Sequence, residues 1–489
     1  MIKNFFEIMR RFFADLVNII IGSDPMILTS SYSIEFKDNL RAVKNTVRLF
    51  REAVEYLITP VKDHYEELEK IKGSNYRQQF IERLVHSTKN HKALYDFDEK
   101  FYKFPSYFRR SAITHAIGVV SSYMSNHKSW EENGCEGNEP KLGTDRNICP
   151  CFFHKNMFLW KEDNKALIKV YADNDWVWRE ITLKKTDLKY FKRRINENSS
   201  VSLSSPTIER KPKGHYFLRF ALTENVELSS APLSERLICS VDLGLNTDAV
   251  CSVMNVHGTV LARKFINCAR EKDSVHNALH RVSVFQRLHG SHDTGRLWSV
   301  AKRRNENHAK LIAHHIVAFA KENHCDVIVF EYLDTRGKKR GSRKQKLAMW
   351  RHRDIQKTAE SLAHKYGMRI SHVNAWNTSK LAYDGSGNVK RGKAVNEGTS
   401  YNMCQFESGK MYNCDLNASY NIGARYFIRE LYNESPDLMA KVPGIGSGTR
   451  RVLADLWHID AVISQYPDIS LGIVSDIGLN RLCTVSAGY

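Results

Sequence analysis

The chain has 489 residues, of which 42% are apolar and 11% aromatic, so it is a globular protein too long for a single hydrophobic core. It carries 73 Lys and Arg residues against 54 Asp and Glu residues, and the formal charge of +19 favours a polyanionic partner over a small metabolite. Its 10 Cys residues show no regular spacing, which excludes a disulfide-stapled fold and indicates a reducing compartment.

Residues 1–25 are predicted to be an N-terminal extension whose role the sequence does not indicate. The segment has basic residues and an apolar run, but Arg10 and Arg11 interrupt the apolar pattern and no small-residue cleavage site follows, so a signal peptide is not favoured. No other segment approaches the roughly 20 apolar residues of a membrane span, and no membrane partner is expected. At Met26 the alternating segment "MILTSSYSIEF" predicts the first strand of a domain.

Residues 40–148 are predicted to form a helical lobe that ends in a connector rich in Gly, Asn and Pro. Apolar residues recur at helical spacing over residues 40–57, and a second helix is expected from Pro105. Arg109 and Arg110 occupy positions of this second helix that we expect to face solvent. A basic, exposed face of this kind would contact nucleic acid.

A small β domain is predicted after the helical lobe. The segments "ALIKVY", "WVWREITL", "PTIERK" and "HYFLRFAL" alternate apolar and polar residues and are separated by turn signals, so each predicts a strand. Residues 149–232, together with residues 26–39, are predicted to form a β-barrel. The helical lobe would then be an insertion after the first strand of this barrel.

Buried strands alternate with helices from residue 237 onward, which predicts an α/β domain. The segments "LICSVDLGLNTDAVCSVM" and "GTVLARKFI" predict three antiparallel strands. A basic helix over residues 298–324 leads into the apolar strand "DVIVFE", and a helix over residues 354–366 leads into the strand "MRISHV".

Three carboxylates occupy positions at which a catalytic site can be built. Asp242 and Glu331 each end a buried strand, and α/β sheets place their sites at the carboxyl ends of strands. Asp415 begins the helix "DLNASYNI", where a carboxylate can also be a simple N-cap. Asp248 and Asp334 lie near the first two in sequence, and we interpret them as surface carboxylates outside the site.

Hydrolysis of a phosphodiester bond is a reaction for which converging carboxylates are suited. Two Mg²⁺ ions about 3.5–4 Å apart activate water and stabilise the leaving oxygen, and they require oxygen ligands. Without the ions the carboxylates would repel one another, so we expect one of them to be partly protonated.

The motifs "VDLGLN", "VFEYLD" and "DLNASYNI", in this order and spacing, resemble the three catalytic motifs of RuvC-like nuclease domains, which belong to the RNase H-like fold. The layout of residues 26–430, with His308, Trp350 and Thr378-Ser379, is similar to the transposon-encoded TnpB nucleases and the compact type V CRISPR effectors. The resemblance implies a multidomain α/β protein with a wedge-like β-barrel at 26–39 and 149–232, a helical recognition-lobe insertion with its connector at 40–148, a RuvC-like nuclease domain at 236–372 and 413–432, a degenerate zinc-ribbon-like insertion for target nucleic acid at 373–412, and a C-terminal tail at 433–489.

The resemblance also implies a function. Asp242, Glu331 and Asp415 would be the catalytic residues and would hold two Mg²⁺ ions. The protein would be an RNA-guided, Mg²⁺-dependent DNA endonuclease, in which a guide RNA pairs with double-stranded target DNA while the protein reads a short flanking motif. Its place would be the prokaryotic cytoplasm, at the nucleoid.

The sequence leaves two alternative functions open. One is an RNA-guided DNA-binding repressor without cleavage, although the three acidic positions are all filled. The other is a guide-independent nuclease selective for branched DNA, which would leave the helical lobe and the β domain unexplained.

One motif of the family is missing. A zinc ribbon with paired Cys-x-x-Cys motifs is expected after Thr378-Ser379, yet "KLAYDGSG" contains no Cys, and only Cys404 and Cys414 follow up to residue 432. Structural zinc needs four tetrahedral ligands, so we predict a ribbon-like hairpin without zinc, held by packing and by turns such as "DGSG". A second candidate zinc site has the right residue types but poor spacing. It consists of Cys135, Cys149, Cys151 and His154.

Basic segments are the remaining candidates for nucleic-acid contact. The loop "RGKKRGSRKQK" follows Glu331 closely, and although many charge runs are only solvated loops, a scissile strand must pass this point. The basic face of the helix over 298–324 is expected to lie against a duplex. Besides Arg109 and Arg110, the expected nucleic-acid contacts are Lys302, Arg303, Arg304, Lys338, Lys339, Arg340, Arg343, Thr378 and Ser379.

Overall fold

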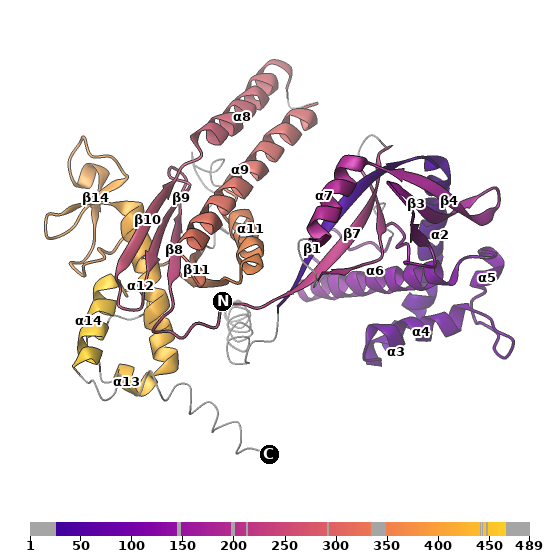
Figure 1. Ribbon diagram of the computed structural model, residues 1–489, viewed down its shortest axis with the longest axis horizontal. Coiled ribbons are helices and arrows are strands. Elements are labelled where there is room, and N and C mark those ends of the chain that lie inside the picture. The colour runs from indigo at the N-terminus through magenta and orange to yellow at the C-terminus, as the bar shows by residue number, and fades with distance from the viewer. Residues whose placement is uncertain are drawn as a thin grey trace. The chain divides into compact units, whose positions relative to one another are not determined.

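The computed structural model of the protein describes residues 26–143, 148–196, 201–211, 214–290, 293–333, 349–440, 442, 444–445 and 448–465, with residues 437 and 438 as backbone only. The predicted N-terminal extension and the loop over 334–348 lie outside these residues. The chain divides into two compact units, which are described separately (Figure 1). The N-terminal unit is Thr29–Asn225, and the C-terminal unit consists of the residues from Val226 onward together with Met26–Leu28 at the start of the first strand.

The N-terminal unit is built on a seven-stranded sheet with the order β2-β3-β4-β1-β7-β5, in which β6 also pairs with β7. β1 lies in the middle of the sheet, although it is separated from the other strands by the helical insertion. Among the described residues no ladder joins β2 to β5 or β6, so the predicted barrel is corrected to an open half-barrel. The strands are β1 (Met26–Lys37), β2 (Phe158–Trp160), β3 (Lys165–Ala172), β4 (Asp175–Leu183), β5 (Ser202–Leu203), β6 (Thr207–Arg210) and β7 (Tyr216–Val226).

The segment between β1 and β2 is mostly helical, and the helical spacing of residues 40–57 predicts its first helix. The apolar stripe of α2 is buried, and its Phe50 ring contacts the Phe108 ring of α6 edge-on at 6.0 Å. The Thr46 hydroxyl accepts a hydrogen bond of 2.8 Å from the Tyr171 backbone, which ties α2 to β3. The helices of this insertion are α2 (Leu40–Asp63), α3 (Tyr65–Lys70), α4 (Ser74–Val85), α5 (Phe97–Lys100) and α6 (Ser106–Glu132).

One helix of the N-terminal unit was not predicted from the sequence. Helix α7 (Lys185–Asn196) follows β4 and buries only Leu188 and Phe191, with the Phe191 ring 4.9 Å from that of Phe220 on β7. Four of its basic side chains are exposed, those of Lys185, Lys189, Lys192 and Arg193. Two apolar residues make only a weak helical pattern, so local periodicity does not predict this helix.

The C-terminal unit contains a five-stranded sheet with the order β10-β9-β8-β11-β12. β8, β9 and β10 are antiparallel, as predicted, whereas β11 is parallel to both β8 and β12. The chain therefore adds β9 and β10 on one side of β8 and then places β11 and β12 on the other side of β8. Such a reversal between neighbouring parallel strands is a topological switch point. The strands are β8 (Ile238–Leu243), β9 (Ala249–Met254), β10 (Val260–Ile266), β11 (Val327–Tyr332) and β12 (Arg369–Asn374).

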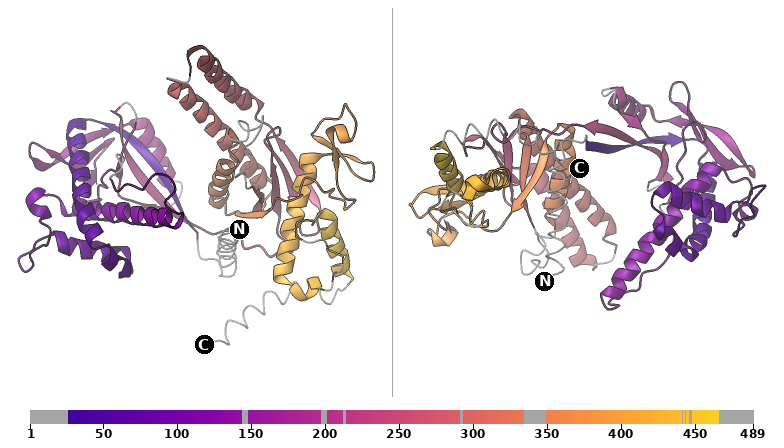
Figure 2. Two further views of the ribbon diagram at one scale, coloured as in Figure 1. Left: turned by 180° about the vertical axis from the view of Figure 1, so that it is seen from behind. Right: turned by 90° about the horizontal axis from the view of Figure 1, so that it is seen from below.

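Helices cover both faces of this sheet (Figures 1 and 2). Helices α9 (Gly295–Glu322) and α11 (His352–Lys365) pack on one face, and α12 (Cys414–Glu434) and α14 (Leu453–Ser464) on the other. Helix α8 (Ala269–His289) packs along α9, and the short α13 (Pro436–Ala440) follows α12. Burial on both faces explains the continuous apolar runs of β9 and β11, and each fully buried aliphatic side chain contributes about 1.5–3 kcal/mol.

A small insertion separates β12 from α12. It contains a three-stranded antiparallel sheet of β13 (Lys390–Arg391), β14 (Met403–Gln405) and β15 (Met411–Asn413), with the turn of 3-10 helix η2 (Gly392–Ala394). Over the whole described part of the chain, none of the helices combines the length and the apolar character that crossing a membrane requires.

Candidate active site

Asp242 and Glu331 lie side by side at the switch point of the C-terminal sheet. Val241 of β8 is in register with Phe330 of β11, so the residues that follow them are neighbours across strands about 4.8 Å apart. Side chains alternate along a strand, and both Val241 and Phe330 face the α9 and α11 side. The two carboxylates therefore face the opposite side, which α12 covers.

Asp415 comes to the same place from the first turn of α12. The N-cap of this helix is Asn413, whose side-chain oxygen accepts a 2.9 Å hydrogen bond from the Leu416 backbone. The carboxylate of Asp415 is therefore not the cap, and the capping function considered for it from the sequence belongs to its neighbour. In the following turns Ser419 contacts Ser252 of β9 through a 2.6 Å hydroxyl hydrogen bond.

Close packing fixes the helix against the sheet. An added Cβ at Gly423 would lie 3.1 Å from the sulfur of Met254 and 3.2 Å from the hydroxyl of Ser240, so only glycine permits this approach without displacing its neighbours. Because the helix cannot move away from β8 and β9, the first turn of α12 and its Asp415 are held over the strand ends.

The electrostatics of the site agree with three converging carboxylates. Burial, together with the negative charges of Glu331 and Asp415, raises the pKa of Asp242 well above its ordinary range, and the charge of Arg391 opposes this rise. Burial raises the pKa of Glu331 to about 6, against a hydrogen bond from Thr378 and the charge of Arg425, both of which lower it. The carboxylates interact strongly enough to favour a proton or a cation between them.

The donor set fits divalent cations that prefer oxygen. Oε1 of Glu331 is buried and has no hydrogen-bond partner among the described residues, so it is a ligand atom available to a cation. Ligand atoms grouped around one ion lie within 4.8 Å of one another, and the oxygens of the three carboxylates do not all meet this spacing. A pair of ions about 3.5–4 Å apart does not require such a compact group, since its outer ligands can lie farther apart.

A ladder of buried polar side chains on α12 positions the loop beside Glu331. The side-chain amide of Asn421 donates to the carbonyls of Thr378 and Leu381, both at 2.9 Å. One turn earlier, Asn417 donates to the Leu381 carbonyl at 2.8 Å and accepts from the Tyr383 backbone at 2.8 Å. These bonds hold the segment that carries Thr378, the donor to Glu331.

Arg425 continues the ladder one turn later. Its guanidinium is 4% exposed and donates to four backbone carbonyls, those of Asn374 at 2.7 Å, Trp376 at 2.8 Å, Arg451 at 3.0 Å and Thr449 at 3.0 Å. Burial lowers the pKa of Arg425 to about 10, although the nearby charge of Glu331 raises it. The residue therefore joins the end of β12 to the segment before α14 and places a positive charge behind the site.

Thr378 and Ser379, predicted as nucleic-acid contacts, occupy different environments. Thr378 is 2% exposed and is directed to Glu331, so it orients a carboxylate and is not available to a phosphate. The Ser379 carbonyl accepts a hydrogen bond from Arg391 of β13, and this contact brings the insertion to the site. Arg391 and Arg425 were both missed from the sequence, because nothing in the local pattern links them to residues so far away.

The insertion over residues 373–412 is held by a small apolar core. Cys404 and Cys414 are 0% and 1% exposed and pack with Ala382 and Phe406. Burial of this kind stabilises the hairpin through packing. The second candidate zinc group consists of Cys135, Cys149, Cys151 and His154. Within the described residues, no three of these side chains have ligand atoms within 4.8 Å of one another.

Asp248, interpreted from the sequence as a surface carboxylate, is only 4% exposed, and that interpretation is corrected. Its carboxylate accepts a 2.7 Å hydrogen bond from the Cys268 backbone and lies 3.1 Å from the Lys272 ammonium and 3.3 Å from His308 Nε2. Burial would raise its pKa, but the hydrogen bonds from His308 and Cys268 and the charge of Lys272 outweigh burial and lower it. Asp248 thus ties the start of β9 to α8 and α9.

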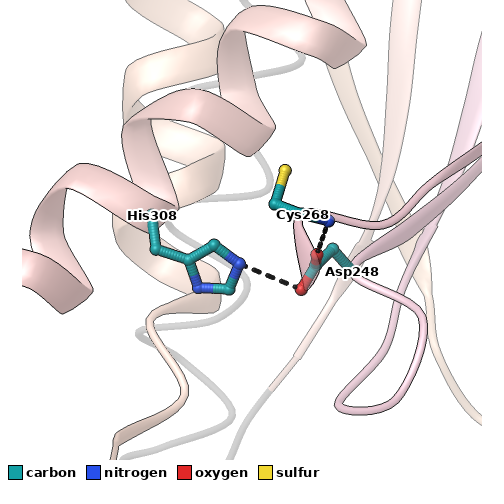
Figure 3. A group of neighbouring side chains, drawn as sticks. All are labelled: Asp248, Cys268 and His308. Carbon is teal, nitrogen blue, oxygen red and sulfur yellow. Dashed lines mark hydrogen bonds and ion pairs between the residues drawn. The ribbon is translucent and has the colours of Figure 1, made fainter. Parts of the chain in front are cut away.

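Asp248, Cys268 and His308 also have ligand atoms within 4.8 Å of one another, and among the described residues they are the one such group of three. Figure 3 shows the Asp248 carboxylate between the His308 ring and the Cys268 backbone nitrogen, with the Cys268 sulfur turned away from it. The Lys272 ammonium already neutralises the carboxylate, and burial raises the pKa of the Cys268 thiol to about 11. The group is therefore a hydrogen-bonded tie between three elements.

The basic residues predicted to contact nucleic acid lie in different environments. Arg109 is 5% exposed and forms ion pairs with Glu82 at 3.3 Å and Asp98 at 3.2 Å, so the prediction that it lies on an exposed face is wrong. Arg110 is half-exposed and pairs with Glu82, while Lys302 and Arg303 are exposed on α9. Arg304 is half-buried and donates to the Ser274 carbonyl at 3.0 Å. Outside the described residues lie Asp334, Lys338, Lys339, Arg340 and Arg343.

Comparison with known proteins gives a partial family match. The model of the Aq_aa04 family matches residues 29–172, a part of the N-terminal unit. No curated protein matches the chain.

Solved structures resemble the chain over most of its length. The Cas12f1-sgRNA-target DNA complex is similar with a TM-score of 0.50 and 14% identity, covering 78% of this chain and 81% of that chain. The mini-RNA-guided endonuclease CRISPR-Cas_phi3 has a TM-score of 0.44 and 11% identity, covering 84% and 94%. CasPhi-2 (Cas12j) bound to crRNA has a TM-score of 0.43 and 9% identity, covering 84% and 98%. The chain thus has a mixed α/β multidomain fold similar to that of Cas12f1.

Proposed function

We propose that the protein is an RNA-guided DNA endonuclease of the TnpB-like and compact type V kind, with a RuvC-like site at Asp242, Glu331 and Asp415. The observation that carries the proposal is the convergence of these carboxylates, two from neighbouring strands at a switch point and one from α12. A likeness of fold to Cas12f1, which was solved with sgRNA and target DNA, supports the same assignment.

The proposed cofactor is a pair of Mg²⁺ ions held by the three carboxylates. When bound, these ions would supply an activated water and stabilise the leaving oxygen of the phosphodiester. The protein's own residues orient the ligands: Thr378 donates to Glu331, Asn413 caps α12 and leaves the Asp415 carboxylate free of that role, and Arg425 holds the adjoining loop. The packed face of α12 excludes water from behind the site.

The proposed partners are a guide RNA and double-stranded target DNA. In this division of labour, base pairing reads the target while the protein reads a short flanking motif and the shape of the backbone. We assign residues 26–39 and 149–232 as the wedge-like domain, 40–148 as the recognition lobe and 373–412 as the target-nucleic-acid insertion. We assign residues 236–372 and 413–432 as the RuvC-like nuclease domain.

The decisive experiment begins with purification of the full chain from its own genomic context and sequencing of the RNA that copurifies. The loaded protein is then tested on a plasmid library that carries the matching target beside randomised flanks. We expect Mg²⁺-dependent cleavage that EDTA stops. Asp242→Asn should reduce the cleavage rate by more than about 100-fold, because the loss of a residue that merely supports a ligand already costs 10–100-fold.

The matched control is Asp273→Asn, which neutralises an exposed carboxylate on α8 of the same unit and should cleave like the wild type. Binding of the matched target without cleavage by the wild-type protein would favour the repressor function. Cleavage of plain branched DNA by RNA-free protein would favour the guide-independent nuclease. Unchanged cleavage by Asp242→Asn would contradict the proposed site.

A further inference from the structure

Two aromatic side chains are exposed at the edge of the sheet where the carboxylates lie. Tyr332, the last residue of β11, is 54% exposed, and Trp376, two residues beyond β12, is 66% exposed. The two strands are parallel neighbours, with Tyr332 in register with Asn374. The rings are therefore carried at the ends of adjacent strands. Tyr332 directly follows Glu331 and, by the alternation of side chains, faces the α9 and α11 side, whereas Trp376 lies just before Thr378.

The backbone that carries Trp376 is held in place although its side chain is exposed. Arg425 donates to the Asn374 and Trp376 carbonyls at 2.7 and 2.8 Å, and the Trp376 backbone donates to the Asn374 side chain at 2.8 Å. A ligand that covered the indole would not have to order this loop, so little of its binding free energy would be lost.

Basic side chains are exposed on the segments next to the two rings. Gln356 of α11 donates to the Glu331 carbonyl at 2.9 Å, which brings the first turns of this helix to the end of β11. Arg353 and Lys357, on either side of Gln356 along the helix, are exposed. Lys380 is exposed two residues after Thr378. A ligand with flat apolar faces and repeated negative charges would match these side chains.

Single-stranded nucleic acid has this chemistry. Its bases offer free π faces for stacking on aromatic rings and its phosphates pair with Lys and Arg, whereas the bases of a duplex already stack on one another. We propose that Tyr332 and Trp376 form a stacking platform for unpaired nucleotides next to the bond to be cut. The inference rests on the proposed function, because it names the form of substrate that the same site receives.

The experiment uses the full-length protein with the Asp242→Asn substitution, which prevents cleavage during binding. The probe is a 12-nucleotide oligothymidylate containing one 2-aminopurine, a base whose fluorescence is quenched when it stacks on an aromatic ring. DNA and RNA forms of the probe distinguish the two sources of single strand. A duplex form, whose bases already stack on one another, serves as the reference in which the rings should add no further quenching. Variants at the platform are Tyr332→Ala, Trp376→Ala, Tyr332→Phe and Trp376→Phe.

We expect quenching with the single-stranded probes and little with the duplex. Each Ala variant should reduce the quenching and weaken binding by about 5- to 100-fold, the effect of losing one stacked base, whereas the Phe variants should retain both. The matched control is Tyr366→Ala. Tyr366 is 52% exposed but lies just before β12, at the opposite end of the sheet, and its loss should change neither readout.

Equal quenching in the wild type and the Ala variants, or an equal loss in Tyr366→Ala, would overturn the platform. Failure of the platform differs from failure of the proposed function. If carboxylate substitutions abolish cleavage while the Ala variants stack the probe normally, only the platform is wrong. If the carboxylate variants still cleave, the nuclease site is wrong, whatever the fluorescence shows.

Discussion

Burial and hydrogen bonding act in opposite directions on the carboxyl group of Glu331. Burial raises its pKa from 4.5 to about 6, even though Thr378 donates to it and Arg425 is close. The folded protein therefore keeps a proton on this residue over a range in which the unfolded chain has lost it. The stability that Glu331 contributes is fully present below about pH 4.5 and is lost as the pH rises through about 6.

This residue predicts a pH-dependent difference between the wild type and Glu331→Gln. In EDTA, the free energy of unfolding of the wild type should fall by about 2 kcal/mol relative to Glu331→Gln between pH 4.5 and pH 7, because Gln does not titrate. Urea unfolding at both pH values measures the difference. Glu322→Gln, at an exposed position of α9, should track the wild type, and a pH-independent difference for Glu331→Gln would contradict the prediction.

At the scale of an element, α12 carries the site because its buried polar side chains bond to distant backbone. Asn417, Asn421 and Arg425 recur one turn apart, so they form one stripe along the helix. Each donates to backbone carbonyls that lie 24 to 51 residues away from it in sequence. Polar and charged residues in such a stripe are normally expected on the solvent-facing side of a helix, yet all three residues are buried.

Replacement of Asn421 by Leu should destabilise the C-terminal unit and weaken cleavage together. The substitution leaves the Thr378 and Leu381 carbonyls without the Asn421 donor in a buried place, at a cost on the order of 3 kcal/mol, and loosens the loop that orients Glu331. Urea unfolding and the cleavage rate measure the two effects.

The control is Asn307→Leu, at an exposed position of α9, which should change the unfolding free energy by less than about 0.5 kcal/mol. Asn421→Asp keeps the oxygen that accepts from the Leu453 backbone but loses the donors, so it should behave like Asn421→Leu. Wild-type stability in Asn421→Asp would show that the donated hydrogen bonds are not what holds the loop.

At the scale of the whole molecule, the two units have separate hydrophobic cores, and the C-terminal helix α14 belongs to the core of the second unit. The sequence suggested no role for this helix. Leu453, Leu456 and Ile459 of α14 are at most 1% exposed, and Trp457 donates to the Gly258 carbonyl at 3.2 Å. The helix thus closes the face of the sheet on which α12 lies.

Leu456→Asp should therefore unfold one unit and not the other. A charge at this fully buried position cannot be hydrated without opening the core that includes α12. Hydrogen exchange followed by mass spectrometry should show a large loss of protection over residues 226–465 and none over residues 29–225. Ala461→Asp, at an exposed position of the same helix, should leave both units protected, and a loss of protection in both units with Leu456→Asp would contradict two separate cores.

Local patterns in the sequence determined most of the elements. The apolar runs of β8, β9 and β11 and the stripes of α2, α9 and α11 appear where their periodicity predicts them, because each depends on neighbours a few residues apart. The positions of Asp242 and Glu331 at strand ends could be predicted for the same reason. Helices α7 and α8 were missed because each buries only two residues, too few to produce a clear period.

Tertiary structure alone decided which polar residues are buried and what they bind. Arg109, Asp248 and Arg425 have the composition of surface residues, but partners far away in sequence neutralise or satisfy them in the interior. Asn413, not Asp415, became the cap of α12, and strand pairing left the first sheet open. The free energy of burying a polar group depends on whether a partner is within reach, and that is a property of the folded chain and not of its local sequence.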